Sequence, residues 1–322
     1  MMLVYAGIDE AGYGPMFGPL CVGASVFVVQ DHDPEDGAPD LWNVLDHIVC
    51  RRRRDRRHRI AVNDSKKLKS SSTPKGLLHL ERGVLSFLSC VHGIGSPNKD
   101  DDFFNTVGCD LSSAPWCCNT STLPIAVDPD QLRIDTSRLR HGLEQANVRC
   151  EMLACLSIDA ATYNERTEIE SKASLNFSTA MRHVDLIIHR WKNEHQRIVI
   201  DRQGGKIRYR NDIQFCWPEA HIQILTEGAT MSRYRLRFGD TLATITFASK
   251  SDENHFPVAI ASMVAKYTRE LQMIRLNRYF VGVMPELKPT AGYVKDGRRF
   301  LKEIEPVLEK KGINPDVLVR TS

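Results

Sequence analysis

The chain of 322 residues carries 43 lysines and arginines against 40 aspartates and glutamates, a formal net charge of +3. Hydrophobic residues make up 42% and charged residues 26%, which is ordinary for a globular protein. No apolar run approaches the roughly 18 residues of a membrane-spanning helix, and residues 1–15 lack the basic start of a secretory signal, so we expect neither. The nine cysteines are scattered and form no C-x-x-C pair, which argues against a disulfide framework or zinc ribbon and favours a reducing cytoplasm.

Apolar runs in the N-terminal part predict buried strands. Residues 3–8 form such a run, which ends at Asp9 and leads into a glycine-containing turn. Residues 20–29 predict the next strand. Residues 51–59 hold seven arginines, one aspartate and one histidine, so this run is either a solvated loop or a contact for the backbone of a nucleic-acid duplex. Residues 93–129 are polar and turn-rich and predict an insertion or a mobile loop.

Strands and helices alternate in the second half of the chain. Residues 152–158 are strand-like, and residues 174–191 carry apolar side chains at helical spacing. Residues 198–200 predict a buried strand that ends at Asp201. The alternation continues with β-rich stretches over residues 206–248 and a buried helix over residues 257–265. A last amphipathic helix is predicted over residues 296–311. This order predicts an α/β or mixed α/β fold.

Two of the predicted strands end in an acid, Asp9 and Asp201. Each acid alone is compatible with a helix cap or a turn, whereas two at corresponding strand ends suggest a shared site, because a carboxylate at the edge of a core needs a partner or a cation. Glu10 follows Asp9, and strand neighbours point to opposite faces, so both serve one site only if the chain bends at once, as Gly12 and Gly14 permit. Carboxylate oxygens suit Mg²⁺, and a pair of such ions supports phosphodiester cleavage.

Five blocks of sequence follow one another along most of the chain. They are residues 7–15 (GIDEAGYGP), 64–68 (DSKKL), 198–201 (IVID), 259–270 (AIASMVAKYTRE) and 292–301, which begins with GY. In this order the blocks resemble ribonuclease HII, the type 2 ribonucleases H, whose first motif reads G-I-D-E-A-G-R-G-P. The first block differs from that pattern at Tyr13 alone.

The resemblance implies an α/β, ribonuclease H-like fold: a mixed five-stranded central sheet flanked by helices, plus a C-terminal helical segment. It implies a catalytic domain over residues 1–285, with insertions at about 91–150 and 206–248. Residues 286–322 would form a helical segment that binds substrate.

The activity implied by the resemblance is that of a metal-dependent endoribonuclease. Such an enzyme cleaves the RNA strand, or embedded ribonucleotides, in RNA–DNA duplexes by two-metal hydrolysis with Mg²⁺ or Mn²⁺, and we expect a cytoplasmic monomer with no membrane partner. The family's four metal-binding carboxylates match Asp9, Glu10, Asp201 and Asp252. Asp252 is chosen over Asp240 because it stands 14 residues before Lys266 (266 − 252 = 14), as the family's fourth acid does.

The substrate-binding positions also follow from the resemblance. The family's G-R-G backbone contacts the ribose 2′-hydroxyl, and a late tyrosine stacks on the following sugar; the matching residues are Gly12, Tyr13, Gly14 and Tyr293. The basic positions are Lys66, Lys67 and Lys266. Tyr13 replaces a cation on the phosphate side, which puts the family's substrate preference in question.

Two alternatives to this function stay open. The first is a ribonuclease H-like nuclease with a changed substrate, such as DNA or a particular nucleic-acid structure; Tyr13 and the insertions motivate it. The second is a non-catalytic nucleic-acid-binding relative. The presence of all four acids speaks against the second, because clustered carboxylates repel one another and phosphate unless a cation lies between them.

Overall fold

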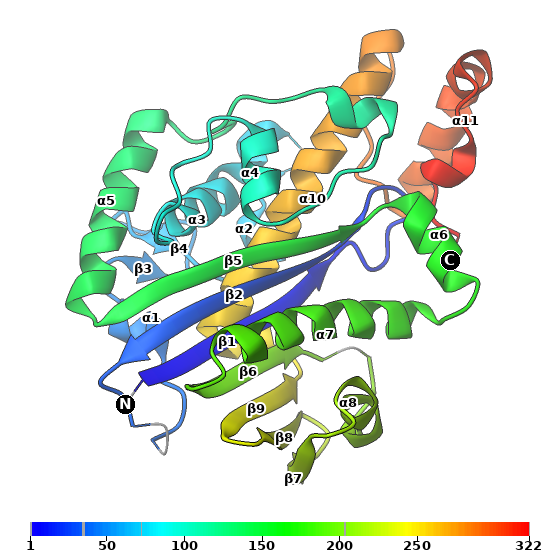
Figure 1. Cartoon of the computed structure of the whole chain (residues 1–322). Helices are drawn as coiled ribbons and strands as arrows, with labels where there is room; N and C mark the ends of the chain where they lie inside the picture. Colours follow the sequence, from blue (N-terminus) through cyan, green and yellow to red (C-terminus); the bar gives the residue numbers. More distant parts are fainter. Residues whose placement is uncertain (1, 34–35, 72, 203, 322) are drawn as a thin grey trace.

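A mixed sheet of seven strands runs through the computed structural model, which describes residues 2–33, 36–71, 73–202 and 204–321 (Figure 1). The strand order is β5-β2-β1-β6-β9-β8-β7. In chain order these strands are β1 (Met2–Ala11), β2 (Leu20–Gln30), β5 (Val148–Ile158), β6 (His195–Asp201), β7 (His221–Glu227), β8 (Met231–Phe238) and β9 (Thr241–Ala248). A separate parallel pair joins β3 (Val49–Cys50) to β4 (Ile60–Ala61).

Helices cover both faces of the sheet. The long helices are α3 (Leu78–Leu88), α5 (Pro129–Gln145), α7 (Lys172–Arg190), α10 (Phe256–Val283) and α11 (Val294–Lys311). The short helices are α1 (Leu41–Val44), α2 (Ser65–Leu68), α4 (Asp100–Thr106), α6 (Ala160–Thr167), α8 (Arg210–Cys216) and α9 (Ser251–Asn254). Figure 1 shows α7 along one face of the sheet and α10 along the other. No helix among the described residues is long and apolar enough to cross a bilayer.

The predicted mixed α/β class is confirmed, but the sheet is larger than expected. Strand β1 is parallel to β6, and β6 is parallel to β9, whereas β2, β5, β7 and β8 pair in antiparallel fashion. Strands β5, β2, β1 and β6 lie outside the expected insertion over 206–248, whereas β9 lies within it. The hairpin of β7 and β8, which lies inside the expected insertion over 206–248, adds two more strands at the edge.

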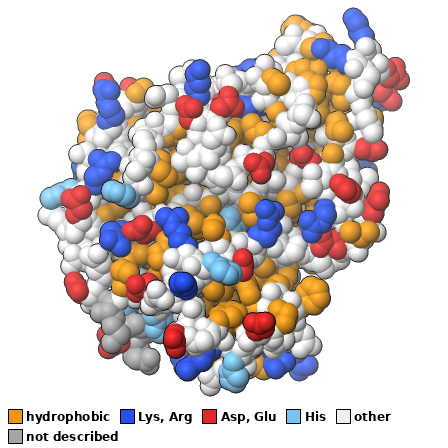
Figure 2. All heavy atoms as spheres, viewed as in Figure 1, with side chains coloured by type: hydrophobic (Ala, Val, Ile, Leu, Met, Phe, Trp, Pro, Cys, Tyr) orange, Lys and Arg blue, Asp and Glu red, His pale blue; other side chains and the backbone are white. Residues whose placement is uncertain are grey.

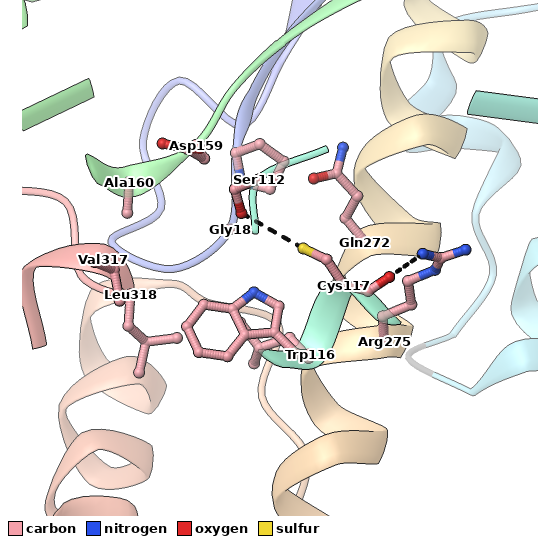
Figure 3. A pocket seen from close by; sticks show the side chains of 12 residues that line it. Gly18, Ser112, Trp116, Cys117, Asp159, Ala160, Gln272, Arg275, Val317 and Leu318 are labelled. Atoms are coloured by element: carbon pink, nitrogen blue, oxygen red, sulfur yellow. Dashed lines mark hydrogen bonds between the residues drawn. The ribbon is translucent and has the colours of Figure 1, made fainter. Parts of the chain in front are cut away.

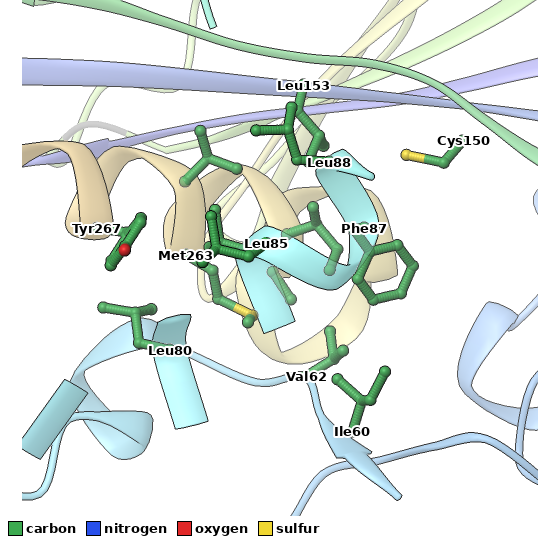
Figure 4. Close-up of a cluster of buried hydrophobic side chains, with 14 of the residues drawn as sticks. Ile60, Val62, Leu80, Leu85, Phe87, Leu88, Cys150, Leu153, Met263 and Tyr267 are labelled. Atoms are coloured by element: carbon green, nitrogen blue, oxygen red, sulfur yellow. The ribbon is translucent and has the colours of Figure 1, made fainter. Parts of the chain in front are cut away.

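Two hydrophobic clusters hold the helices to the sheet. The cluster on the α10 face includes Leu85 and Leu88 of α3 with Met263 of α10, three of the side chains in Figure 4. The cluster on the opposite face joins Val184 and Ile187 of α7 to alternate residues of the strands. Helix α7 confirms the predicted amphipathic helix, and the hydroxyl of Ser171 caps it by accepting a hydrogen bond from the Ser174 N–H at 3.1 Å.

The polar segment 93–129 is anchored by a buried carboxylate on α3. Glu81 is fully buried and accepts hydrogen bonds from the backbone N–H groups of residues 125–127 at 2.6 to 2.9 Å. Its carboxylate also accepts a hydrogen bond from the Tyr267 hydroxyl on α10 at 2.7 Å. Sequence patterning offered no sign of this anchor, because the donors are backbone groups far away along the chain.

His183 is a buried titratable group at the interface of α7 and the sheet. Its side chain is 2% exposed, and Nε2 lies 2.9 Å from the carbonyl oxygen of Val22 on β2. Burial lowers the pKa of His183 to about 4 and outweighs this hydrogen bond, which acts in the opposite direction. The imidazole is therefore neutral in the folded protein at neutral pH.

We expect this histidine to make folding stability depend on pH. The folded pKa lies below the unfolded value near 6.5, so the stabilisation is complete above about pH 6.5 and is lost as the pH falls toward 4, by about 3 kcal/mol in all. The change His183→Gln should remove this contribution. Urea unfolding of both proteins at pH 7 and pH 4.5 measures it, and an equal loss of stability in the two would contradict the assignment.

Candidate active site

The register of two parallel strands places Asp9 beside Asp201. Ile8 of β1 pairs with Ile200 of β6, so the two acids occupy adjacent positions one residue further on, at the carboxyl ends of the strands. Ile8 and Ile200 both belong to the cluster on the α7 face, so the next side chains along each strand leave the sheet on the α10 face. The two strand-end acids that the sequence suggested for a shared site are therefore neighbours.

Glu10 reaches the same region from the other face of the sheet. Strand β1 continues to Ala11 and bends only at Gly12, where φ is +86°, so the expectation of an immediate bend after Asp9 is wrong. The side chains accordingly have different neighbours. Burial raises the pKa of both carboxyls, and the groups that partly oppose this increase are Ser262 of α10 for Asp9 and Asn176 of α7 for Glu10. Alternation along a straight strand thus delivers two carboxylates to one strand end from opposite faces.

One cavity of about 310 Å³ gathers nearly all of the predicted site residues. The predicted acids on its wall are Asp9, Glu10, Asp201 and Asp252. The other predicted residues on its wall are Gly12, Tyr13, Gly14, Lys66, Lys266 and Tyr293. Lys67 does not line the cavity and instead forms an ion pair with Glu253. A different pocket, between α10 and the segment that contains Trp116 and Cys117, contains none of the predicted site residues (Figure 3).

The hydrogen bonds of Asp201 place Asp252 in the cavity. Asp201 Oδ1 accepts from the Ser251 backbone N–H at 3.1 Å and from the Ser251 hydroxyl at 2.6 Å. Ser251 is fully buried and begins helix α9, whose next residue is Asp252. Asp240 lies in the turn between β8 and β9, at the opposite end of β9 from Ala248, which pairs with Asp201. The structure thus separates the two candidates for the fourth acid by the length of a strand.

The acids raise one another's pKa values. The pKa of Asp9 lies well above its usual range, first because of burial and then because of the charges of Glu10 and Asp201. Burial and the charge of Asp201 raise the pKa of Glu10 to about 7. Burial, Asp64 and Asp201 raise the pKa of Asp252 to about 6. These shifts share one cause, which is negative charge concentrated in a partly desolvated space.

This donor set suits a hard divalent cation. Within residues 2–33, 36–71, 73–202 and 204–321, no three carboxylate, imidazole or thiol groups stand in a geometry that would hold a metal ion as they are. The four predicted carboxylates nevertheless border one cavity, and burial together with neighbouring negative charge raises the pKa of Asp9, Glu10 and Asp252. A cation among them would reverse that effect, and oxygen ligands of this kind are those that Mg²⁺ prefers.

The structure adds site residues that the sequence analysis did not single out. Asp64 caps α2 by accepting the Lys66 N–H at 2.9 Å, lines the cavity and raises the pKa of Asp252. Its signal was the D-S-K-K-L block, in which only the lysines were assigned a role. Asn176 is fully buried on α7 and acts on Glu10. It carried no signal, since a single amide in an amphipathic helix has the appearance of a core position.

Tyr13 lies beside a cationic side chain. Its ring packs at the edge of a small cluster that includes Leu20 and Tyr163, and the Lys172 ammonium lies 4.4 Å from the ring centroid. This distance is within the range of a cation–π contact. Gly12 is required at its position, because a Cβ there would lie 2.5 Å from the Pro19 carbonyl oxygen. Tyr293 is 55% exposed at the start of α11, on the wall of the cavity.

The cationic residues differ in how far they are neutralised. Lys266 pairs with Glu270 at 2.8 Å, whereas Lys66 forms no ion pair with any described residue. In the arginine run 51–59, Arg51 donates to the backbone carbonyl of Glu253 and stacks 3.5 Å above the Trp42 ring. The run therefore begins beside the cavity, since Glu253 follows Asp252.

Comparison with known proteins finds structural neighbours only. No family model and no curated protein sequence matches the chain. The chain is similar to the ribonuclease HII of Archaeoglobus fulgidus in its complex with PCNA (18% identity, TM-score 0.42, 99% of this chain and 94% of that chain). It is also similar to the ribonuclease H2 of Pyrococcus horikoshii, with 18% identity and a TM-score of 0.47 over 98% of this chain and 92% of that chain. A further similar structure is Bst-RNase HIII in complex with Mn²⁺, with 14% identity and a TM-score of 0.40 over 99% of this chain and 66% of that chain. The first of these neighbours carries the name of the family that the sequence motifs resemble.

The position of the fourth acid gives a direct test of the site. We expect Asp252→Asn to lose at least about 100-fold in nuclease turnover, because the variant keeps the side-chain volume but loses a charge in the cavity. The matched change Asp240→Asn removes the same charge at the far end of β9 and should leave turnover near that of the wild type. Rates measured on one substrate, with folding checked by circular dichroism, compare the two. If only Asp240→Asn loses turnover, the fourth acid is Asp240 and not Asp252.

Proposed function

We propose that the chain belongs to the ribonuclease HII family and is a metal-dependent endoribonuclease. Its substrate would be the RNA strand, or embedded ribonucleotides, in an RNA–DNA duplex. One observation carries the proposal: four acids predicted from separate motifs, Asp9, Glu10, Asp201 and Asp252, border a single cavity. Three segments distant in sequence contribute them, so their meeting follows from the fold.

The four acids would share one part in the proposed chemistry, which is to bind metal. Asp9, Glu10, Asp201 and Asp252 would hold Mg²⁺ or Mn²⁺. When bound, divalent ions supply activation of water and stabilisation of the leaving oxygen in phosphodiester hydrolysis. Ser251 fixes Asp201 through two hydrogen bonds, and Asn176 favours the ionised form of Glu10. The two hydrogen bonds from Ser251 would keep Asp201 oriented for a cation, and Asn176 partly opposes the raised pKa of Glu10.

The remaining residues of the cavity suit recognition of a ribose and its phosphate. The backbone at Gly12 and Gly14 has no side chain between it and the cavity, so it can approach a 2′-hydroxyl, the group that distinguishes RNA from DNA. Tyr293 would stack on the adjacent sugar. Lys66 and Lys266 would balance phosphate charge. In this proposal residues 1–285 form the catalytic domain, and residues 286–322, which contain α11, bind substrate.

A nuclease with a changed substrate is the second candidate. Two observations favour it: Tyr13 stands where the family has a cation, and the β7–β8 hairpin enlarges the sheet beside the site. A non-catalytic nucleic-acid-binding relative fits less well, because four mutually repelling carboxylates hinder phosphate binding and stabilise nothing without a cation.

Cleavage of three duplexes side by side separates these candidates. We expect the wild type with Mg²⁺ or Mn²⁺ to cut an RNA–DNA hybrid or a DNA duplex with one ribonucleotide, and to spare an all-DNA duplex. The change Asp201→Asn should abolish cutting but leave the fold intact, since Asn keeps the volume and drops the charge. Cutting of the all-DNA duplex would favour the changed nuclease, and binding without any cutting would favour the non-catalytic relative.

Tyr13 provides a test of how the ribose is recognised. If main-chain groups of Gly12 and Gly14 read the 2′-hydroxyl, Tyr13→Arg should strengthen hybrid binding at low salt, by less than about tenfold, and leave the preference for ribose over deoxyribose unchanged. The limit is set by Lys172, whose charge already lies over the ring. Tyr13→Phe keeps that ring and serves as control. Weaker binding and cleavage by Tyr13→Arg at every salt concentration would show that Tyr13 serves packing instead.

A further inference from the structure

The β7–β8 hairpin carries a row of arginines on one face of the sheet. Strand β8 reads M-S-R-Y-R-L-R-F, so Arg233, Arg235 and Arg237 alternate with apolar residues. Tyr234 and Leu236 are fully buried in the cluster on the α7 face. Because strand side chains alternate, the three arginines leave the sheet on the opposite face, which carries α10. We call these three residues the β8 arginine row.

The β8 arginine row shares its face of the sheet with Asp9 and Asp201 and begins close to Asp201. Asp201 pairs with Ala248 of β9, and Arg233 pairs with Thr246, two residues before Ala248 on the same strand. At about 3.3 Å per residue, Arg233, Arg235 and Arg237 follow at about 7, 13 and 20 Å along the sheet from the level of Asp201. The row therefore leads straight away from the cavity.

The charges of the row are not neutralised by the protein. Among the described residues, none of the three arginines forms an ion pair; Arg233 donates to the Thr246 hydroxyl at 3.2 Å, and the buried Nε of Arg235 has no hydrogen-bond partner. Their cross-strand neighbours on β7 and β9 include no acidic residue: His221, Gln223, Thr226, Leu242, Thr244 and Thr246. On the α7 face, by contrast, basic and acidic side chains are interspersed (Figure 2). An uncompensated row of guanidinium groups suits a partner with regularly spaced negative charge.

We propose that the β8 arginine row binds the sugar–phosphate backbone of the duplex on one side of the cleavage site. The row spans about 13 Å, which corresponds to about four successive phosphates at 3.4 Å of helix axis each. Arginine suits the task because its planar fork donates two hydrogen bonds to one phosphate. The inference rests on the proposed nuclease function. It adds a contact region on the β7–β8 edge, whereas α11 lies at the other side of the molecule (Figure 1).

A double substitution with a matched control tests this contact. The test variant is Arg235→Gln/Arg237→Gln, which spares Arg233 next to the cavity. The control is Arg138→Gln/Arg182→Gln, which removes the same charge from two exposed positions on α5 and α7. Binding of a catalytically inactive Asp201→Asn background to an RNA–DNA hybrid is measured over a salt series. We expect the slope of log K against log salt to fall by about 1 per lost contact, hence by about 2, in the test variant alone.

The length of the duplex provides the second readout. Hybrids are shortened to about four base pairs on one side of the cleavage position and then on the other, since about 20 Å corresponds to about six base pairs. The weaker hybrid binding of the test variant, relative to the control variant, should disappear when the duplex is shortened on the side that contacts the β8 arginine row. It should persist when the duplex is shortened on the other side. If the slope of log K against log salt is the same for the test and control variants while the wild type still cuts the hybrid, the proposed backbone contact of the β8 arginine row is wrong and the proposed function stands. A wild type that cuts no hybrid would instead overturn the proposed function.

Discussion

Mutual repulsion among buried carboxylates is the constraint on which this site depends. Asp9, Glu10 and Asp252 all have raised pKa values, and burial is the first cause in each case. A fold gains no stability from such an arrangement, because each carboxylate loses hydration and meets further negative charge. The protein opposes the repulsion locally, through Ser251 on Asp201 and through the charge of Lys66. The remaining imbalance is the physical reason to expect a cation there.

The sheet imposes this crowding through register alone. Parallel pairing of β1 with β6 and of β6 with β9 brings the carboxyl ends of three strands to one edge. Asp9 and Asp201 stand at the same level on neighbouring strands, and the turn after β9 starts the helix that contains Asp252. Side-chain alternation then sends Glu10 to the opposite face, where α7 meets it. A one-residue slip of β1 would exchange the faces of Asp9 and Glu10 and dismantle the site.

Motif spacing predicted the acids, whereas their supports emerged only in three dimensions. The apolar runs before Asp9 and Asp201 indicated strands, and the 14-residue spacing from Lys266 favoured Asp252, which the structure places in the cavity. The role of Asn176 beside Glu10 could not be predicted from the sequence, because helical periodicity indicates only that its position is buried. The hairpin was expected as an insertion, but its pairing with β9 was not, since strand pairing is set by contacts between distant segments. The same limit concealed Glu81, whose partners are backbone groups.

The distribution of charge also determines where binding affinity arises. A cavity lined by five carboxylates repels phosphate, so attraction of a polyanion must come from cations around it and from any ion the carboxylates hold. Lys66 is at the rim, and the arginine run begins beside Glu253. The β8 arginine row lies on the α10 face, on a strand that is separated by β9 from β6, the strand that ends in Asp201. Under the proposed function, such an anionic centre with cationic flanks would bind a duplex by its backbone on either side and leave the centre to a cation, so that affinity and chemistry would fall to different residues.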